Sequence, residues 1–462
     1  MPSVTIESSR RPMLARPAFR PVIRQHTLGR EFDTMSSVTP TAIPAPAPAS
    51  HLLPNVPLLA LDRQHAVLRG EIKAAVDRVC DSGRFVLGPD VSALEEELAA
   101  SLGVPHAISC ASGSDALLLA LMALGIGMGD EVIVPSYTFF ATASAVTRLG
   151  AIPIFADIDP TTYLVDPEDV KRKVSRRCRA IIPVHLFGRT ADMDALCPIA
   201  EAAGVPIVED AAQSILSTWK GRCSGALGDI GCFSFYPTKN LGGAGDGGFV
   251  TTTRDDLAKA LKLLRVHGME PRYYHDLIGI NSRLDTIQAA VLRVKLPHLD
   301  AWTTSRQKNA ARYSELFAAH GLSNHVTVPT DEPRGRHVWN QYVIRVADGQ
   351  RDALRKHLTA CGVGTEIYYP VPLHLQTCFS YLGWRKGDLP RTELAAEETL
   401  ALPIFPELRA DEQTTVVARI AEFFGTKPKP TEASGTVQPK PAKAHSPHVI
   451  RRAVGRADEV IS

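Results

Sequence analysis

The chain has 462 residues, more than one hydrophobic core of ordinary size accommodates, so two packed domains are expected. A hydrophobic content of 45%, a charged content of 22% and a formal net charge of +2 are ordinary values for a globular protein, and they give no reason to expect a nucleic-acid partner. No run of about 18 apolar residues occurs in the sequence, which argues against a membrane-spanning helix.

The eight cysteines are scattered along the chain, mostly within apolar runs. They form no CxxC pair and no cluster with histidine, so no metal site is predicted. Isolated cysteines of this kind are typical of reduced thiols, which indicates a cytoplasmic protein.

The two ends of the chain differ in composition from the rest. Residues 1–55 begin with an arginine-rich, acid-poor segment that is followed by TPTAIPAPAPAS, and residues 426–462 are rich in proline, lysine and serine. Neither segment has a periodic apolar face, so both are predicted to be disordered. For the first segment, a transit peptide or a true start at Met35 are alternatives, although its prolines oppose the amphipathic helix of a transit peptide.

Between these ends, short runs rich in β-branched residues alternate with helical patterns. The runs are HAISC, EVIVP, IPIFAD, RAIIPVH and VPIVED, and the segments between them include SDALLLALMALG, ATASAVTRLG and ADMDALCPIAEAAG. This alternation predicts an α/β fold with a mostly parallel sheet that has helices on both faces.

The pattern changes near residue 300. A helical stretch over residues 284–299 is followed by the helical segment AWTTSRQKNAARYSELFAAHG, by an isolated strand in HVWNQYVIRV and by a helix in RDALRKHLTACG. The sequence therefore predicts a large domain at residues 56–300 and a smaller α+β domain at residues 301–425.

The sharpest local pattern is FSFYPTKNLGGAGDGG, in which a strand-like run ends at Tyr236 and Lys239 lies in a turn before five glycines. A turn lysine is usually just exposed, but Ser234 lies five residues upstream, and a hydroxyl and an amine that flank one bend can hold two ends of one ligand. The glycines allow the backbone to approach that ligand closely, with a simple hairpin turn as the alternative. No GK[ST] follows the glycines, so a nucleotide-triphosphate loop is not expected.

This segment resembles the cofactor-lysine segment of the DegT/StrS-type nucleotide-sugar aminotransferases, a family of fold-type-I pyridoxal-phosphate enzymes. The resemblance extends over residues 57–425 and includes, in order, SGSDALLLAL, GDEVIVPSYTFFAT, VEDAAQS, GINSRLDTIQAA and YYPVPLHLQ. It implies a large domain with a mostly parallel sheet flanked by helices, a smaller C-terminal α+β domain, and Lys239 carrying pyridoxal 5'-phosphate as a Schiff base.

The resemblance also implies the other cofactor contacts. Ser112, Gly113 and Ser114 open a helix after the strand HAISC, where free backbone N–H groups suit a phosphate; an ordinary serine cap is the alternative. Asp210 ends the strand VPIVED and is expected to pair with the pyridine nitrogen, which keeps the ring an electron sink. The remaining implied contacts are Phe139 stacking on the ring, with Phe140 as its competitor, Gln213 near the phenolic oxygen, and Ser234 beside the phosphate.

Five further residues are implied to meet the cofactor or the substrate. Asn281 in GINSRL resembles a residue that reaches the cofactor phosphate of the neighbouring subunit, although it could be only a helix cap, and Arg283 is expected at an anionic part of the substrate. Shared sites of this kind imply an obligate homodimer. Tyr368, Tyr369 and His374 in YYPVPLHLQ fall where the family lines its sugar pocket.

The implied reaction moves an amino group from an amino acid, L-glutamate by resemblance, to a keto carbon of a nucleotide-linked sugar, with C3 favoured over C4, for aminosugar and polysaccharide biosynthesis. Sugar dehydratases of the family carry histidine where Lys239 stands, so the lysine favours transamination. A non-catalytic regulatory protein of the same fold would be expected to lose some of Lys239, Asp210, Ser234 and Asn281, and all four are present.

Overall fold

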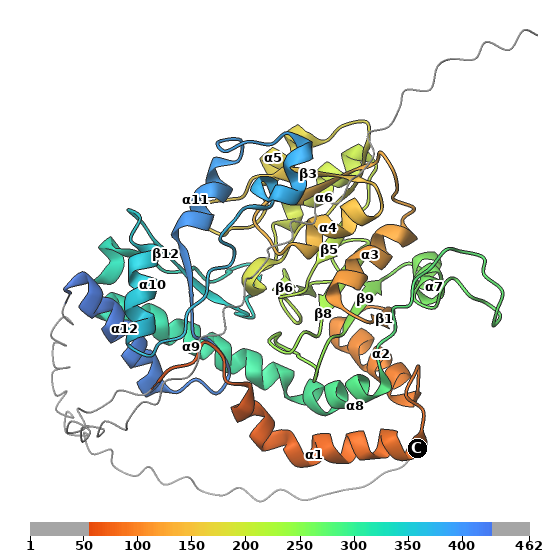
Figure 1. Ribbon diagram of the computed structural model, residues 1–462, viewed down its shortest axis with the longest axis horizontal. Coiled ribbons are helices and arrows are strands. Elements are labelled where there is room, and N and C mark those ends of the chain that lie inside the picture. Colours follow the sequence, from red (N-terminus) through yellow and green to blue (C-terminus); the bar gives the residue numbers. More distant parts are fainter. Residues whose placement is uncertain (1–54, 427–462) are drawn as a thin grey trace, which may run out of the picture. The chain divides into compact units, whose positions relative to one another are not determined.

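The computed structural model describes residues 55–426 of the chain (Figure 1). The predictions of disorder for residues 1–55 and 426–462 concern segments that lie outside the described residues, apart from one residue at each boundary. Among the described helices, none is both long enough and apolar enough to cross a membrane.

A seven-stranded sheet organises the first half of the described chain. Three parallel strands, β3 (Ile152–Ala156), β2 (Glu131–Pro135) and β4 (Cys178–Ile181), lie in that order. Parallel bridges from Ile181 to Ile207 and from Val184 to Asp210 continue the sheet into β5 (Val208–Asp210), β8 (Ile230–Ser234), β9 (Gly248–Thr252) and β1 (His106–Cys110). Only β9 runs against its neighbours β8 and β1, so the predicted mostly parallel sheet is confirmed.

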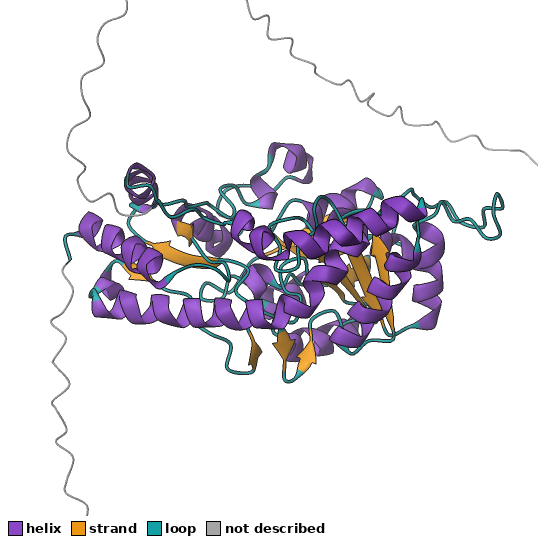
Figure 2. Cartoon of the chain, turned by 90° about the horizontal axis from the view of Figure 1, so that it is seen from below, coloured by secondary structure: helices purple, strands orange, loops and turns teal. Residues whose placement is uncertain are grey.

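Helices cover both faces of this sheet because its strands alternate their side chains between two apolar cores (Figure 2). Cys232 and Val250 face a core shared with α3 (Gly113–Ala123), α4 (Ala141–Arg148) and α7 (Asp255–Leu264). Their neighbours Phe233 and Phe249 stack at 4.3 Å in a core shared with α2 (Pro89–Leu102) and α8 (Thr286–Lys295). Further along the same face, Ile133 packs with α5 (Pro167–Lys173) and α6 (Met193–Ala203).

The C-terminal part has a separate core around a small antiparallel sheet. Its strands are β10 (Val326–Thr327), β12 (Tyr342–Val346) and β13 (Thr399–Leu402), and its helices are α9 (Leu299–Ala319), α10 (Arg351–Ala360) and α12 (Ala410–Phe424). The expectation of an isolated strand in HVWNQYVIRV is wrong, because β12 is the middle strand of this sheet. Its neighbours give weak sequence signals, since β10 has two residues and β13 follows directly on helix α11 (Pro390–Glu398).

Near residue 300, two α-helices follow each other with only a short 3-10 turn between them. Helix α8 ends at Lys295, a 3-10 turn at Leu296–His298 contains Pro297, and α9 begins at Leu299. The division into domains at residues 56–300 and 301–425 stays a prediction, and its boundary falls in the first turn of α9. The remaining elements are α1 (Leu61–Ser82), which packs on α8, β6 (Thr218–Trp219), β7 (Arg222–Cys223), β11 (Gly335–Arg336), and 3-10 helices at Leu186–Gly188, Leu322–Asn324, Leu373–Leu375 and Thr377–Leu382.

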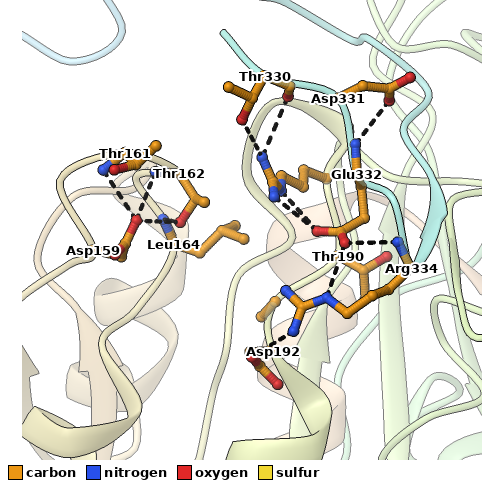
Figure 3. Close-up of polar contacts among 12 residues, drawn as sticks. Asp159, Thr161, Thr162, Leu164, Thr190, Asp192, Thr330, Asp331, Glu332 and Arg334 are labelled. Atoms are coloured by element: carbon orange, nitrogen blue, oxygen red, sulfur yellow. Dashed lines mark hydrogen bonds and ion pairs between the residues drawn. The ribbon is translucent and has the colours of Figure 1, made fainter.

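An ion-pair network around the buried Glu332 carboxylate fixes the segment that leads into β11. The Glu332 carboxylate accepts hydrogen bonds from Nε of Arg189 and Nε of Arg334, both at 3.0 Å, and Arg334 also pairs with Asp192 at 3.0 Å (Figure 3). Asp192 is the N-cap of α6, so the network ties that helix to residues 330–334. Because the Glu332 side chain is only 1% exposed, it depends on these partners for its charge to be tolerated.

Candidate active site

A cavity of about 590 Å³ lies at the carboxyl ends of the parallel strands, where ligands bind in sheets of this kind. The residues predicted from the sequence that line it are Ser112, Gly113, Ser114, Phe139, Asp210, Gln213, Ser234, Lys239, Tyr368 and Tyr369. The chain thus brings together, in one cavity, residues from four loops that follow separate strands and from a loop of the C-terminal part.

Three serine hydroxyls and the start of α3 form one end of the cavity. Ser112 is the N-cap of α3, with its Oγ accepting from the backbone N of Asp115 at 3.1 Å, and Ser234 accepts from the backbone N of Tyr236 at 3.2 Å. A Cβ atom added to Gly113 would lie 2.7 Å from Cβ of Ser234, so only glycine lets the two segments approach this closely. Both hydroxyls keep a hydrogen to donate, and the helix start adds free N–H groups, as a phosphate requires. The cap role of Ser112 and a phosphate role are therefore compatible.

Asp210 provides a buried carboxylate at the end of β5. Its Oδ2 accepts from Oγ1 of Thr142 at 2.8 Å, and its Oδ1 accepts from the backbone N of Ala212 at 3.2 Å. Burial raises the pKa of Asp210, whereas these hydrogen bonds and the charge of Lys239 act in the opposite direction. A fixed carboxylate in a low-dielectric cavity is suited to pair with a protonated ring nitrogen.

Beneath Asp210, the neighbouring Glu209 holds the strand end in place. Its carboxylate accepts from the backbone N atoms of Gly225, Leu227 and Gly228 at 2.7–2.8 Å, and it lies 2.8 Å from Nε2 of His185. The backbone N of Ala191 donates to Nδ1 of His185, so Nε2 carries the hydrogen that is donated to Glu209. His185 is therefore a fully bonded core residue and does not line the cavity.

Lys239 lies half-buried in a tight turn on the cavity wall, with its backbone N donating to the carbonyl of Tyr236 at 2.8 Å. Burial lowers the pKa of Lys239 to about 8, against the opposing charge of Asp210. An amine with this pKa is partly neutral at physiological pH, so it can act as a nucleophile and as a base.

Two residues that the sequence analysis did not select hold this turn. The Nζ of Lys295 donates to the carbonyl of Gly242 at 2.5 Å, and Nδ2 of Asn240 donates to the carbonyl of Val338 at 2.9 Å. No local pattern marks Lys295, because its burial on α8 arises from packing against segments distant in the sequence. For Asn240, its position next to Lys239 was the only feature of the sequence that could have indicated a role in the site.

Aromatic and amide side chains also line the cavity. Phe139 is 56% exposed and lies 6.0 Å from the ring of Tyr369, whereas Phe140 packs at 5.6 Å against Phe379 and does not line the cavity. Gln213 donates from Nε2 to the hydroxyl of Tyr369 at 3.3 Å. Phe139 is thus the ring that faces the cavity. Thr138, Tyr236, Thr238, Asp246 and Gln341 line it as well and were not selected from the sequence.

The structure does not bring three predicted residues to this cavity. His374 is buried, with Nδ1 2.7 Å from Oγ of Ser136 and Nε2 3.2 Å from the Glu393 carboxylate, so the expectation that it contacts the sugar finds no support within this chain. Asn281 is exposed and Arg283 half-buried just before α8, both outside the cavity wall. A residue that acts in the cavity of a partner subunit has to lie outside the cavity of its own chain.

The donor set fits pyridoxal phosphate, because it offers hydroxyls for a phosphate, a buried carboxylate for a ring nitrogen, an aromatic face, and an amine of lowered pKa for an aldehyde. Residues 67–421 match the model of the DegT/DnrJ/EryC1/StrS aminotransferase family, so the chain belongs to this family and is an aminotransferase. Its fold is that of the fold-type-I pyridoxal-phosphate transferases, as predicted.

Individual relatives match about four fifths of the chain. It is 48% identical to a pleiotropic regulatory protein of Geobacillus stearothermophilus over 80% of this chain and 99% of that one. It is 44% identical to the dTDP-3-amino-3,4,6-trideoxy-alpha-D-glucose transaminase of Streptomyces venezuelae, with 80% and 96% covered. The crystal structure of S. venezuelae DesV in complex with a ketimine intermediate is similar with a TM-score of 0.77 at 44% identity, over 80% of this chain and 98% of that one.

Proposed function

We propose that this aminotransferase uses pyridoxal 5'-phosphate, held by Lys239, to move an amino group from an amino acid, L-glutamate, to C3 of a nucleotide-linked keto sugar. The observation that carries the proposal is that one cavity contains Lys239 with a pKa of about 8, the buried carboxylate of Asp210 and the hydroxyls at the start of α3. The name of the S. venezuelae transaminase supports both the nucleotide-linked sugar and its third carbon.

Each of these residues has a role that follows from its position in the cavity. Ser112, Ser114 and Ser234 would hold the phosphate, and Asp210 would keep the ring nitrogen protonated. When bound, the cofactor supplies an electron sink that stabilises negative charge on the carbon of the amino group. The amine of Lys239 would serve as the base that removes the proton from that carbon and as the acid that gives it back, because a pKa near the working pH suits both roles.

The proposal includes a homodimer with shared sites, located in the cytoplasm and serving aminosugar and polysaccharide synthesis. The loop between α7 and α8, which projects from the rest of the chain in Figure 1, supports the dimer because it exposes Tyr273, Tyr274 and Ile278, the last at 94%. The same loop ends at Asn281. Mixing Lys239→Ala with Asn281→Ala subunits should restore activity that neither variant has alone; no restoration at any ratio would exclude shared sites.

A regulatory role is the second candidate, because the relative that is 48% identical is named a pleiotropic regulatory protein. The two functions differ in one spectroscopic test. L-Glutamate alone should convert the visible spectrum of the loaded protein to that of the amino form of the cofactor, and a nucleotide-linked 3-keto sugar should reverse the change. A spectrum that no amino acid alters would favour the regulatory role.

A further inference from the structure

Gln341 has a side chain whose polar end lacks a partner. Its Oε1 is buried and accepts no hydrogen bond from any of residues 55–426. A buried carbonyl oxygen that accepts no hydrogen bond is unfavourable. We therefore expect Oε1 of Gln341 to accept a hydrogen bond from a molecule that is not part of this chain.

The backbone holds Gln341 firmly beside the cavity. Just before it, the backbone N atoms of Val338 and Asn340 donate to the carbonyls of Gly188 and Phe187, both at 2.9 Å, and β12 begins directly after it. Gln341, Tyr368 and Tyr369 line the cavity from the C-terminal part of the chain, whereas Ser112 and Ser114 line it from the start of α3.

A second, smaller cavity of about 20 Å³ also borders Gln341, next to Thr161 and Thr162. Two of its donors are committed, since Oγ1 of Thr162 donates to Asp159 at 3.0 Å (Figure 3) and Arg189 is bonded to Glu332 and Thr330, whereas the Tyr163 hydroxyl and Nε2 of His337 also border it. The volume is that of one water molecule, so a bound water is the competing partner for the amide.

The unpaired atom is an acceptor, and this separates the two substrates. At neutral pH the carboxylates of L-glutamate are themselves acceptors, and its one donor, the amino group, is the group that reacts, whereas a sugar ring offers hydroxyl donors. We propose that Gln341 is a specificity-determining residue that accepts a hydrogen bond from a ring hydroxyl of the nucleotide-linked sugar. This inference rests on the proposed function and identifies one residue that contacts the nucleotide-linked sugar.

The test follows the two half-reactions separately, by single-turnover absorbance of the loaded enzyme. Gln341→Met keeps the length of the side chain and removes the acceptor. With the amino sugar dTDP-3-amino-3,6-dideoxy-glucose, which runs the sugar half-reaction in reverse on the pyridoxal form, it should lower kcat/KM by about 10- to 100-fold and leave the L-glutamate half-reaction within about twofold. Gln350→Met, an exposed glutamine outside the cavity, is the matched control and should change neither.

The hydroxyl is identified with the 2-deoxy and 4-deoxy forms of the same sugar. With the wild type, one of the two deoxy sugars should show a kcat/KM lowered by a similar factor. With Gln341→Met, the same deoxy sugar should show no such decrease, since the variant already lacks the hydrogen bond to that hydroxyl. Equal losses in both half-reactions, or deoxy effects that persist unchanged in the variant, would assign the amide to a structural water and overturn the inference. A wild type that reacts with L-glutamate but with no nucleotide sugar would instead overturn the proposed substrate, and the inference with it. Thermal unfolding of both variants verifies that they fold.

Discussion

The side-chain amides of Asn240 and Asn340, one hundred positions apart, are bonded to each other, with Nδ2 of Asn340 donating to Oδ1 of Asn240 at 2.7 Å. Asn240 also donates to the carbonyl of Val338, so the residue after Lys239 is fixed to the segment that carries Gln341. One buried polar contact thus joins the lysine turn to a second segment that lines the cavity through Gln341.

Breaking this contact should loosen the turn without removing any group that meets a ligand. Asn240→Ala is expected to weaken retention of pyridoxal phosphate by about tenfold, because two buried hydrogen-bond partners are left unpaired at a cost of about 1–3 kcal/mol each. Dialysis followed by absorbance measures the retention. Asn309→Ala, which loses a 2.9 Å bond to the carbonyl of Phe405 far from the turn, is the control; equal retention in all three proteins would exclude a positioning role.

Glu332→Ala should destabilise the fold by about 3–5 kcal/mol, since it leaves the buried guanidinium of Arg189 without its counter-charge. Urea unfolding measures the difference. Asp300→Ala removes an exposed pair with Arg336 and should cost at most about 1 kcal/mol. If both substitutions lowered the free energy of unfolding by a similar amount, the network in Figure 3 would contribute no more to stability than an exposed ion pair.

His337 makes the fold sensitive to acid. Burial, and to a lesser degree Arg189, lowers the pKa of His337 to about 3 from 6.5, so between these values the unfolded chain takes up a proton that the folded chain refuses. This group's contribution to stability is therefore lost as the pH falls from 6.5 towards 3, by at most about 1.4 kcal/mol per pH unit. His337→Phe should lose less stability than the wild type between pH 7 and pH 5 in urea titrations, and parallel losses would contradict the assignment.

The lowered pKa of Lys239 predicts how the apoprotein takes up its cofactor. Only a neutral amine attacks an aldehyde, and with a pKa of about 8 the neutral fraction rises with pH and reaches one half near pH 8. The initial rate of bonding to pyridoxal phosphate, followed by absorbance, should show this midpoint. Rates that rise only through pH 10 and above would indicate an ordinary exposed lysine.

Much of the fold could be predicted because the parallel strands are short and mostly buried, as the fully buried run EVIVP in β2 shows. The candidate site could be predicted where a residue lies at or just after the carboxyl end of a strand, as Asp210 does in β5 and Ser112 does after β1, since strand ends of one direction meet at one edge. His374 was misplaced because its sequence position does not reveal that its ring turns inward to Ser136 and Glu393. Lys295 and Gln341 gave no signal, because their surroundings come from segments distant in the chain.

The most direct measurement identifies which lysine bonds to the cofactor. Two described lysines have a pKa lowered by burial to about 8, Lys239 on the cavity wall and Lys295 behind the turn. Borohydride reduction of the loaded protein, followed by peptide mass spectrometry, should find the cofactor mass on Lys239 alone, and Lys239→Ala should lose both the mass and the visible absorbance band. Label on Lys295, or a band that survives Lys239→Ala, would contradict the proposed role of Lys239.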